Sequence, residues 1–123
     1  MDVTPLVPKD RQVIDSYSAQ GFRVSGTLYT GPILVLPQAT HPWAVSGLPE
    51  IGLDNLAPVL DAAVQILLLG CGKHMARVPP QLRQELRARR IVVDAMDTGA
   101  ACRTYNILLA EDRRVAAALL PNH

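Results

Sequence analysis

The first third of the chain carries short apolar runs that are separated by glycine, proline and small polar residues. This pattern is typical of β-strands joined by tight turns, because Gly and Pro interrupt the apolar runs at turns. The expected strands lie at residues 13–17, 22–24, 27–29 and 33–36, with a further extended stretch at 41–45. The first two flank the segment Ser18-Ala19-Gln20-Gly21, and this arrangement predicts a hairpin.

From Asp54 onward the pattern alternates between helical and strand-like segments. The run Val64–Leu69 is the strongest strand signal, and its apolar character on both faces predicts a strand covered by layers on both sides. Helices are expected at 54–60, 80–90 and 97–111, and strands at 64–69, 91–93 and 114–120. The alanines of the last segment also fit an extension of the helix before it.

The stretch from Ile91 to Leu109 organises the second half of the chain. It begins as a β-branched apolar run, crosses Asp97-Thr98-Gly99, and continues as an Ala- and Leu-rich segment that favours helix. A strand that feeds a helix through so tight a turn is half of an α/β unit. Gly70-Cys71-Gly72 forms a similar corner after the preceding strand. Neighbouring parallel strands end at one edge of a sheet, so we expect the two corners to open side by side.

Length and composition predict one α/β domain. The chain has 123 residues, of which 49% are hydrophobic, and this is enough for a core without disulfides or a structural metal. Residues 1–11 contain two prolines and mixed charge, so we interpret them as a flexible tail. Residues 12–123 form the predicted domain.

Charge and cysteine content narrow the class of protein. The net charge of +1 provides no general electrostatic basis for binding nucleic acid. Two cysteines make no disulfide framework and are typical of a reducing compartment. The first residues lack a basic segment followed by an apolar one, and no apolar run approaches the ~20 residues of a membrane helix. We therefore expect a cytoplasmic location without membrane insertion.

A set of residues spread over roughly 12–120 resembles a known family. The matching residues are Ala95–Thr98, Ala100–Leu108, Glu111 and Arg113–Ala116, with Tyr17, Gly21-Phe22, Gly31, Ile33–Pro37, Trp43, Leu68–Gly70 and Gly72 upstream. This pattern resembles a small α/β family whose mitochondrial members are assembly factors for respiratory complex I and whose bacterial members are mostly uncharacterised. Two positions depart from the family pattern: Asp94 stands where Glu is usual and Cys71 where Thr is usual, which alters any polar contact made there.

The resemblance implies a fold and a class of function. The implied fold is a three-layer single domain around a mixed, mostly parallel five-stranded sheet, here with an additional N-terminal β-hairpin layer. The implied function is assembly or chaperone-like protein binding, without an established catalytic activity. Because no transit peptide is visible, the chain is interpreted as a bacterial homologue.

A candidate ligand site follows from the two corners. Free N–H groups and the helix dipole make a helix start attractive to anions, and Arg103 can clamp a carboxylate or phosphate. The alternative is that Asp97 or Thr98 caps its own helix and that Asn106 makes a buried hydrogen bond, for example to the 70–72 turn. The candidate site residues are Gly70, Cys71, Gly72, Asp97, Thr98, Gly99, Arg103 and Asn106.

Other chemical motifs are incomplete. Gly70-Cys71-Gly72-Lys73 lacks the spacing of a phosphate loop. Cys71-x-x-His74 offers two metal ligands, but no four-ligand set is completed. Cys102 lies between Ala101 and Arg103 and is interpreted as a small buried residue rather than as a nucleophile. We therefore predict no catalytic residue, no metal and no cofactor.

Structural roles are also predicted for a tyrosine, a tryptophan and a group of arginines. Tyr105 lies on the apolar stripe of its helix, so its ring is expected against the sheet with the hydroxyl bonded at the edge. Trp43 is interpreted as a cap over one end of the core rather than as an interface anchor. Arg83, Arg87 and Arg90 share one helix face, which predicts a solvated surface or the rim of a protein interface.

Two hypotheses on function remain. The first is a non-enzymatic protein-binding module that assists assembly of a membrane-associated complex through an unidentified protein partner, with weak self-association left open. The second is a small-molecule binder, or an enzyme of unknown reaction, with its site between Gly70–Gly72 and Met96–Arg103.

Overall fold

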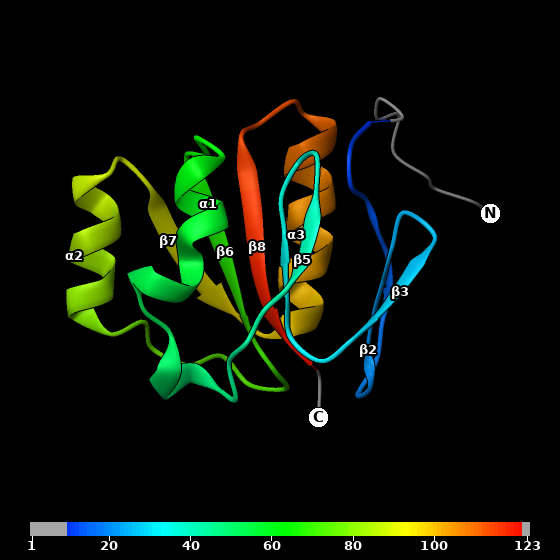
Figure 1. The fold of residues 1–123 in the computed structure, drawn as a ribbon, viewed down its shortest axis with the longest axis horizontal. Helices are drawn as coiled ribbons and strands as arrows, with labels where there is room; N and C mark the ends of the chain where they lie inside the picture. The colour runs from blue at the N-terminus through cyan, green and yellow to red at the C-terminus, as the bar shows by residue number, and fades with distance from the viewer. Residues whose placement is uncertain (1–9, 122–123) are drawn as a thin grey trace.

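The structure is a computed structural model that describes residues 10–121 (Figure 1). The predicted flexible tail at 1–11 falls mainly on residues 1–9, which lie outside this described part. Within it, none of the helices combines the length and the hydropathy that a membrane span requires.

A five-stranded mixed sheet forms the middle layer (Figure 1). Its strands, in the order in which they pair, are β5 (Thr40–Pro42), β4 (Ile33–Val35), β8 (Val115–Leu120), β6 (Ile66–Cys71) and β7 (Val92–Met96). The pairs β6–β7 and β6–β8 are parallel, whereas β4 runs antiparallel to both β8 and β5. Every strand but β4 therefore points in the same direction.

The Ala-rich segment β8 is the central strand rather than an extension of the helix before it. All six of its residues are buried. It lies between β4 and β6, with apolar layers on both faces. Small side chains such as those of Ala116, Ala117 and Ala118 fit this position because neighbouring elements approach the strand closely from both sides.

One face of the sheet is covered by short helices. These are the 3₁₀ segments η1 (Leu48–Glu50) and η2 (Leu53–Leu56), and the α-helices α1 (Ala57–Asp61) and α2 (Pro80–Ala88). The predicted α2 stripe is confirmed, because Leu82 and Leu86 are both buried in this half of the core. Trp43 is 4% exposed and its Nε1 donates to the Asn55 carbonyl at 2.9 Å, so its role as a cap over the core is also confirmed.

Helix α3 and a second sheet cover the opposite face (Figure 1). Helix α3 spans Thr98–Ala110, and the second sheet is antiparallel with β1 (Ile14–Tyr17), β2 (Gly21–Val24) and β3 (Thr27–Thr30). The predicted hairpin is therefore present and is extended by a third strand. The buried Tyr105 hydroxyl lies 3.0 Å from the Gln12 carbonyl oxygen and 3.2 Å from that of Leu36, which fixes α3 against both sheets. The predicted three-layer α/β fold is confirmed.

Strand β7 is an edge strand and is longer than the pattern indicated. It continues to Met96, whereas the apolar run predicted a strand that ends at Val93. The difference arises because Asp94 faces solvent on the outermost strand, so it breaks the apolar pattern without breaking the ladder to β6. The free side of β7 presents backbone groups that pair with no other strand of the described residues.

Candidate functional site

The two predicted corners lie side by side at one edge of the main sheet. Gly70 pairs in register with Met96 on β7, so the carboxyl ends of β6 and β7 coincide. The Thr98 N–H donates to the Gly72 carbonyl at 2.8 Å, and the Gly72 N–H donates to Thr98 Oγ1, also at 2.8 Å. This reciprocal pair joins the turn after β6 directly to the start of α3.

Thr98 also binds β8, the strand on the other side of β6. Its hydroxyl donates to the Leu120 carbonyl at 2.6 Å, and the residue is fully buried. Gly70 lies close beside it, and a Cβ at this position would crowd the joint, at 2.9 Å from Leu119 Cδ2 and 3.2 Å from Thr98 Cα. Gly72 has a φ of +88°, which favours glycine. The hydroxyl of Thr98 is therefore used by the fold and is not directed at a ligand.

The start of α3 is capped by the chain itself. Asp97 Oδ1 accepts a hydrogen bond from the Ala100 N–H at 2.9 Å, which agrees with the capping interpretation of this residue. The Tyr17 side chain lies over Gly99, since a Cβ on Gly99 would stand 2.6 Å from the Tyr17 hydroxyl. The sequence indicated Tyr17 as part of a strand and of the family resemblance but not as a site residue, because no local pattern connects β1 with a helix start 82 residues later.

Arg103 points outward and contacts β1. Its Nη1 donates to the Tyr17 hydroxyl at 3.0 Å, and the residue is exposed. A cleft of about 360 Å³ opens here between β1 and α3, lined by Arg103, Tyr17, Cys102 and Asn106 among others. The guanidinium is thus available to an anion from solvent, with one neutral hydrogen-bond partner in place.

The suggested partner of Asn106 is wrong. Its amide does not reach the 70–72 turn but pairs with the backbone of Ile14: the Ile14 N–H donates to Oδ1 at 3.0 Å, and Nδ2 donates to the Ile14 carbonyl at 2.8 Å. The side chain leaves α3 on the face that packs on β1, whereas the turn lies at the end of the helix. Asn106 therefore joins α3 to β1 through two hydrogen bonds with the backbone of Ile14.

Neither cysteine has the environment of a nucleophile. Burial raises the pKa of the Cys102 thiol to about 12, against which the nearby Arg103 has a smaller opposing effect. Burial also raises the pKa of Cys71, whose Sγ lies 3.7 Å from the Leu69 carbonyl oxygen. Between residues 10 and 121, no three His, Cys, Asp or Glu side chains gather as a metal site.

The eight candidate residues therefore divide among three places. Gly70, Asp97, Thr98 and Gly99 build the joint between the corners and line none of the clefts described here. Cys71 and Gly72 line a cleft of about 420 Å³ that also includes Leu120 and Pro121. Arg103 and Asn106 line the separate cleft beside β1. The corners meet as predicted, but they do not enclose one pocket.

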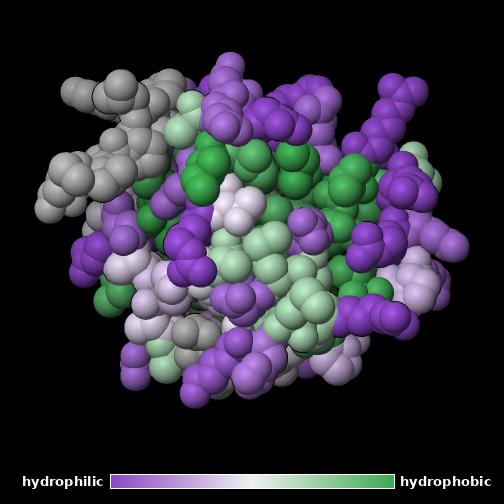
Figure 2. Space-filling view, turned by 180° about the vertical axis from the view of Figure 1, so that it is seen from behind, coloured by the Kyte–Doolittle hydropathy of each residue, from purple (hydrophilic) through white to green (hydrophobic). Residues whose placement is uncertain are grey.

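An apolar surface that the sequence patterns did not indicate lies beside the edge strand β7. Figure 2 shows hydrophobic side chains gathered across the face that carries α3 and β7. Val92 is 63% exposed and Ile107 is 58% exposed, values that are high for such residues. We define the β7–α3 surface as Ile66, Val92, Met96, Ile107 and Leu108, which are exposed or half-buried. The position of Ile107 opposite the buried stripe of its helix indicated that its side chain is exposed. The exposure of Val92 could not be predicted without knowing that β7 is an edge strand.

Comparisons with known proteins identify relatives over most of the chain. The model of a family described as protein of unknown function (DUF498/DUF598) matches residues 14–120. The NADH dehydrogenase (ubiquinone) 1 alpha subcomplex assembly factor 3 of Xenopus tropicalis is 36% identical over 88% of this chain and 60% of its own length. An uncharacterised protein of Rhodobacter capsulatus is 40% identical over 88% of this chain and 83% of its own.

Solved structures share the fold. The solution structure of a Bordetella pertussis protein, described as a Mth938-like domain, has a TM-score of 0.80 and 28% identity, covering 99% of this chain and 93% of that one. The chain spans about 60% of the length of the assembly factor from Xenopus tropicalis. The shared region is thus the α/β domain itself.

Proposed function

This chain belongs to the DUF498/DUF598 family, and from that premise we propose that it is a non-enzymatic protein-binding module that assists assembly of an NADH dehydrogenase-type complex. The observation that carries the proposal is the 36–40% identity to assembly factor 3 and to an uncharacterised bacterial protein, extending through 88% of the chain. Its location in the cytoplasm stays a prediction.

The β7–α3 surface supports a protein partner. Large exposed apolar patches on a domain mark interaction sites, because covering them with another protein removes apolar area from water. Val92 and Ile107 provide such area next to a strand whose outer side pairs with no other strand of the described residues. The Val93 carbonyl on that side accepts a hydrogen bond from Arg83 Nη1 of α2 at 3.2 Å. An extended segment of a partner that displaces the Arg83 side chain can therefore add to the sheet at β7 while its own side chains cover the apolar residues.

Asp94 narrows the chemistry of that partner. It is exposed in the middle of β7 and shares a face with Val92 and Met96, because alternate residues of a strand point the same way. A carboxylate in an apolar docking surface must be paired or remain at the rim to avoid the cost of desolvation. We therefore propose a subunit segment that carries apolar residues with one Lys or Arg opposite Asp94.

A co-purification experiment tests the proposal. The tagged chain is recovered from its native cells after mild solubilisation of the membranes, and NADH dehydrogenase subunits are quantified by mass spectrometry. Val92→Glu places a second carboxylate in the surface. Leu28→Glu is the matched control, because Leu28 on β3 is 64% exposed against 63% for Val92.

The expected result is enrichment of NADH dehydrogenase subunits with the wild-type chain and with Leu28→Glu, and loss of that enrichment with Val92→Glu. Absence of these subunits from the wild-type sample would reject the proposed role. Equal enrichment with Val92→Glu and with the control would reject the β7–α3 surface as the docking site.

A second candidate function is the binding of a small anion beside Arg103. It is favoured by the exposed guanidinium that lines the cleft between β1 and α3. A rise of the melting temperature with inorganic phosphate, lost in Arg103→Gln but kept in Arg87→Gln on α2, is the expected result. A rise that survives Arg103→Gln would place the anion elsewhere and dismiss this candidate.

A further inference from the structure

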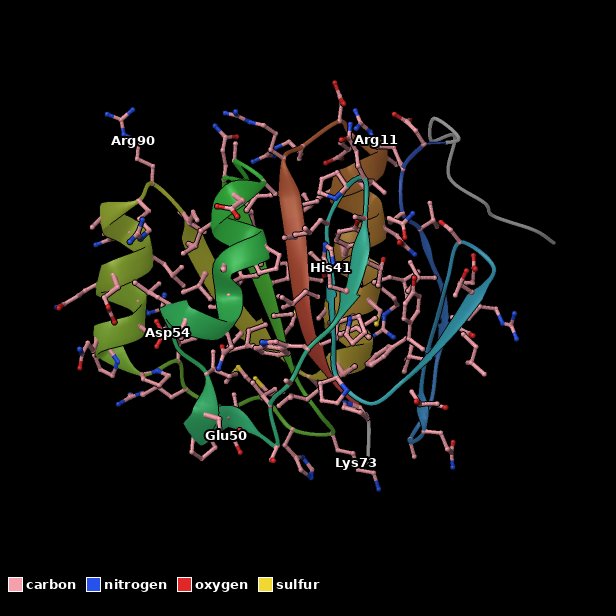
Figure 3. All side chains as sticks on the ribbon, viewed as in Figure 1. Arg11, His41, Glu50, Asp54, Lys73 and Arg90 are labelled. Atoms are coloured by element: carbon pink, nitrogen blue, oxygen red, sulfur yellow. The ribbon has the colours of Figure 1, made fainter. Side chains whose placement is uncertain are left out.

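The largest of the three clefts lies at the end of the sheet opposite to the corners. Its volume is about 760 Å³, within the range of small-molecule sites. It is formed by the β4–β5 turn, the end of α1 and the loop from α3 to β8. Figure 3 shows Arg11 at this end, beside the end of α3, and Lys73 at the opposite end, where the corners lie.

The lining combines an apolar floor with a cationic rim. Leu36 and Leu109 are buried side chains that face the cleft. Arg11, Arg113 and Arg114 lie around it, together with His41. Two carboxylates, Asp61 and Asp112, also line the cleft, so the three guanidiniums outnumber them. A molecule with an apolar body and an anionic head matches both parts.

The backbones of Arg113 and Arg114 are hydrogen-bonded within the fold, whereas their guanidiniums have no protein partner among the described residues. The Arg113 N–H donates to the Leu108 carbonyl at 3.0 Å, and the Arg114 carbonyl accepts from Gln65 at 2.9 Å and from Ile66 at 3.2 Å. Among residues 10–121, no hydrogen bond or ion pair engages the guanidinium of either arginine. The fold therefore holds the backbone of both residues at the rim, and their exposed guanidiniums are free to bind.

Besides the exposed carboxylate of Asp61, the cleft has two sources of negative charge near its cationic rim, and both compete only weakly with an incoming anion. The ion pair between Arg11 and Asp112 is long, at 3.9 Å, and the Asp112 side chain is 94% exposed. Such exposed pairs contribute little to stability. The last carbonyls of α3 accept N–H bonds from residues 111–113, so the negative end of that helix is already partly compensated.

We propose that this cleft binds a small organic anion, a phosphate monoester or a carboxylate, whose apolar body lies on Leu36 and Leu109. Arg113 and Arg114 hold the charged head, because planar guanidiniums pair with two oxygens of such groups. Arg11 adds to the positive rim once the anion replaces Asp112. The site is separate from the β7–α3 surface and does not depend on the proposed role in assembly.

An NMR titration of the labelled chain tests this assignment. The probes are phenyl phosphate and phenylacetate, with inorganic phosphate as the head alone and phenol as the body alone. At least one of the first two is expected to shift the amides of Ala39, Ala62 and Arg113, and to bind about tenfold or more tightly than phosphate or phenol. Arg113→Ala combined with Arg114→Ala is expected to weaken binding at least about tenfold.

Two further variants separate this site from a general charge effect. Arg87→Ala combined with Arg89→Ala removes the same charge from the last turn of α2 and the residue that follows it, and is expected to leave the affinity unchanged. Asp112→Asn removes the competing carboxylate and is expected to tighten binding, since Asn tolerates the φ of +60° at this position. Shifts confined to Gly72 and Arg103, affinity unchanged by Arg113→Ala with Arg114→Ala, or no binding of either organic anion would overturn the assignment.

Discussion

Replacement of Thr98 by valine tests the joint between the two corners. Valine keeps the shape of the side chain and replaces the hydroxyl by a methyl group. That hydroxyl donates to the Leu120 carbonyl at 2.6 Å and accepts from the Gly72 N–H at 2.8 Å, in a fully buried position. The substitution therefore leaves one buried acceptor and one buried donor without this partner while the packing volume is preserved.

The magnitude follows from the cost of these two groups. Each buried polar group left without a partner costs about 1–3 kcal/mol. The gain from burying a methyl in place of a hydroxyl offsets roughly 1 kcal/mol of that sum. We expect Thr98→Val to lower the free energy of unfolding by about 1–5 kcal/mol, a large share of the total stability of a small domain.

Urea unfolding of four proteins measures the effect. Thr98→Ser keeps the hydroxyl and loses a buried methyl, so its expected loss is about 1 kcal/mol. Thr27→Val, at an exposed position on β3, is expected to stay within about 0.5 kcal/mol of the wild type. The reasoning fails if Thr98→Val unfolds at the same urea concentration as the wild type, or if Thr98→Ser is destabilised as much as Thr98→Val.

Further predictions concern the same region and can be checked by urea unfolding. Gly70→Ala should lower the free energy of unfolding by about 1–3 kcal/mol through overpacking against Leu119. Gly52→Ala, with open space around Gly52, should leave it nearly unchanged, and equal effects of the two substitutions would contradict the packing argument. Burial raises the pKa of Cys102 to about 12 from an ordinary value of 9.0, so the protonated thiol stabilises the fold below pH 9 and this contribution is lost as the pH rises towards 12. The stability of the wild type relative to Cys102→Ala should therefore fall by about 2 kcal/mol between pH 8 and pH 10.5, and a constant difference would refute the burial effect. Asn106→Ala should cost about 1–2 kcal/mol and accelerate hydrogen exchange of the Ile14 amide; unchanged exchange would mean that the Asn106 pair does not hold β1.

Strong local patterns predicted most elements of the fold. The apolar run at β6, the Leu stripe of α2 and the Asp97 cap of α3 are features of neighbouring residues, so the sequence alone indicated them. The adjacent corners followed from the parallel βα arrangement. The strand predicted at 114–120 is confirmed as β8, although its alanines also fit a helix. Its central place in the sheet did not follow from the sequence, because strand order depends on pairing between distant segments.

The candidate site was less accessible to prediction because it depends on contacts between distant segments. Tyr17 covers Gly99, and Asn106 pairs with Ile14, 92 residues away. Neither contact leaves a pattern within its own segment. The exposed position of Val92 likewise follows only from the location of β7 at the edge of the sheet. The local sequence patterns located the two corners. Only the contacts between distant segments show that hydrogen bonds join the corners, so that they do not enclose a pocket.

The amount of assembled NADH dehydrogenase in membranes tests the central claim most directly. In cells that lack the gene for this chain, the wild type, Leu28→Glu and Val92→Glu are each restored at equal expression, and the assembled complex is quantified on native gels. The wild type and Leu28→Glu should restore it, and Val92→Glu should leave it near the level of the deletion. Full assembly with Val92→Glu, or no loss on deletion, would contradict the account.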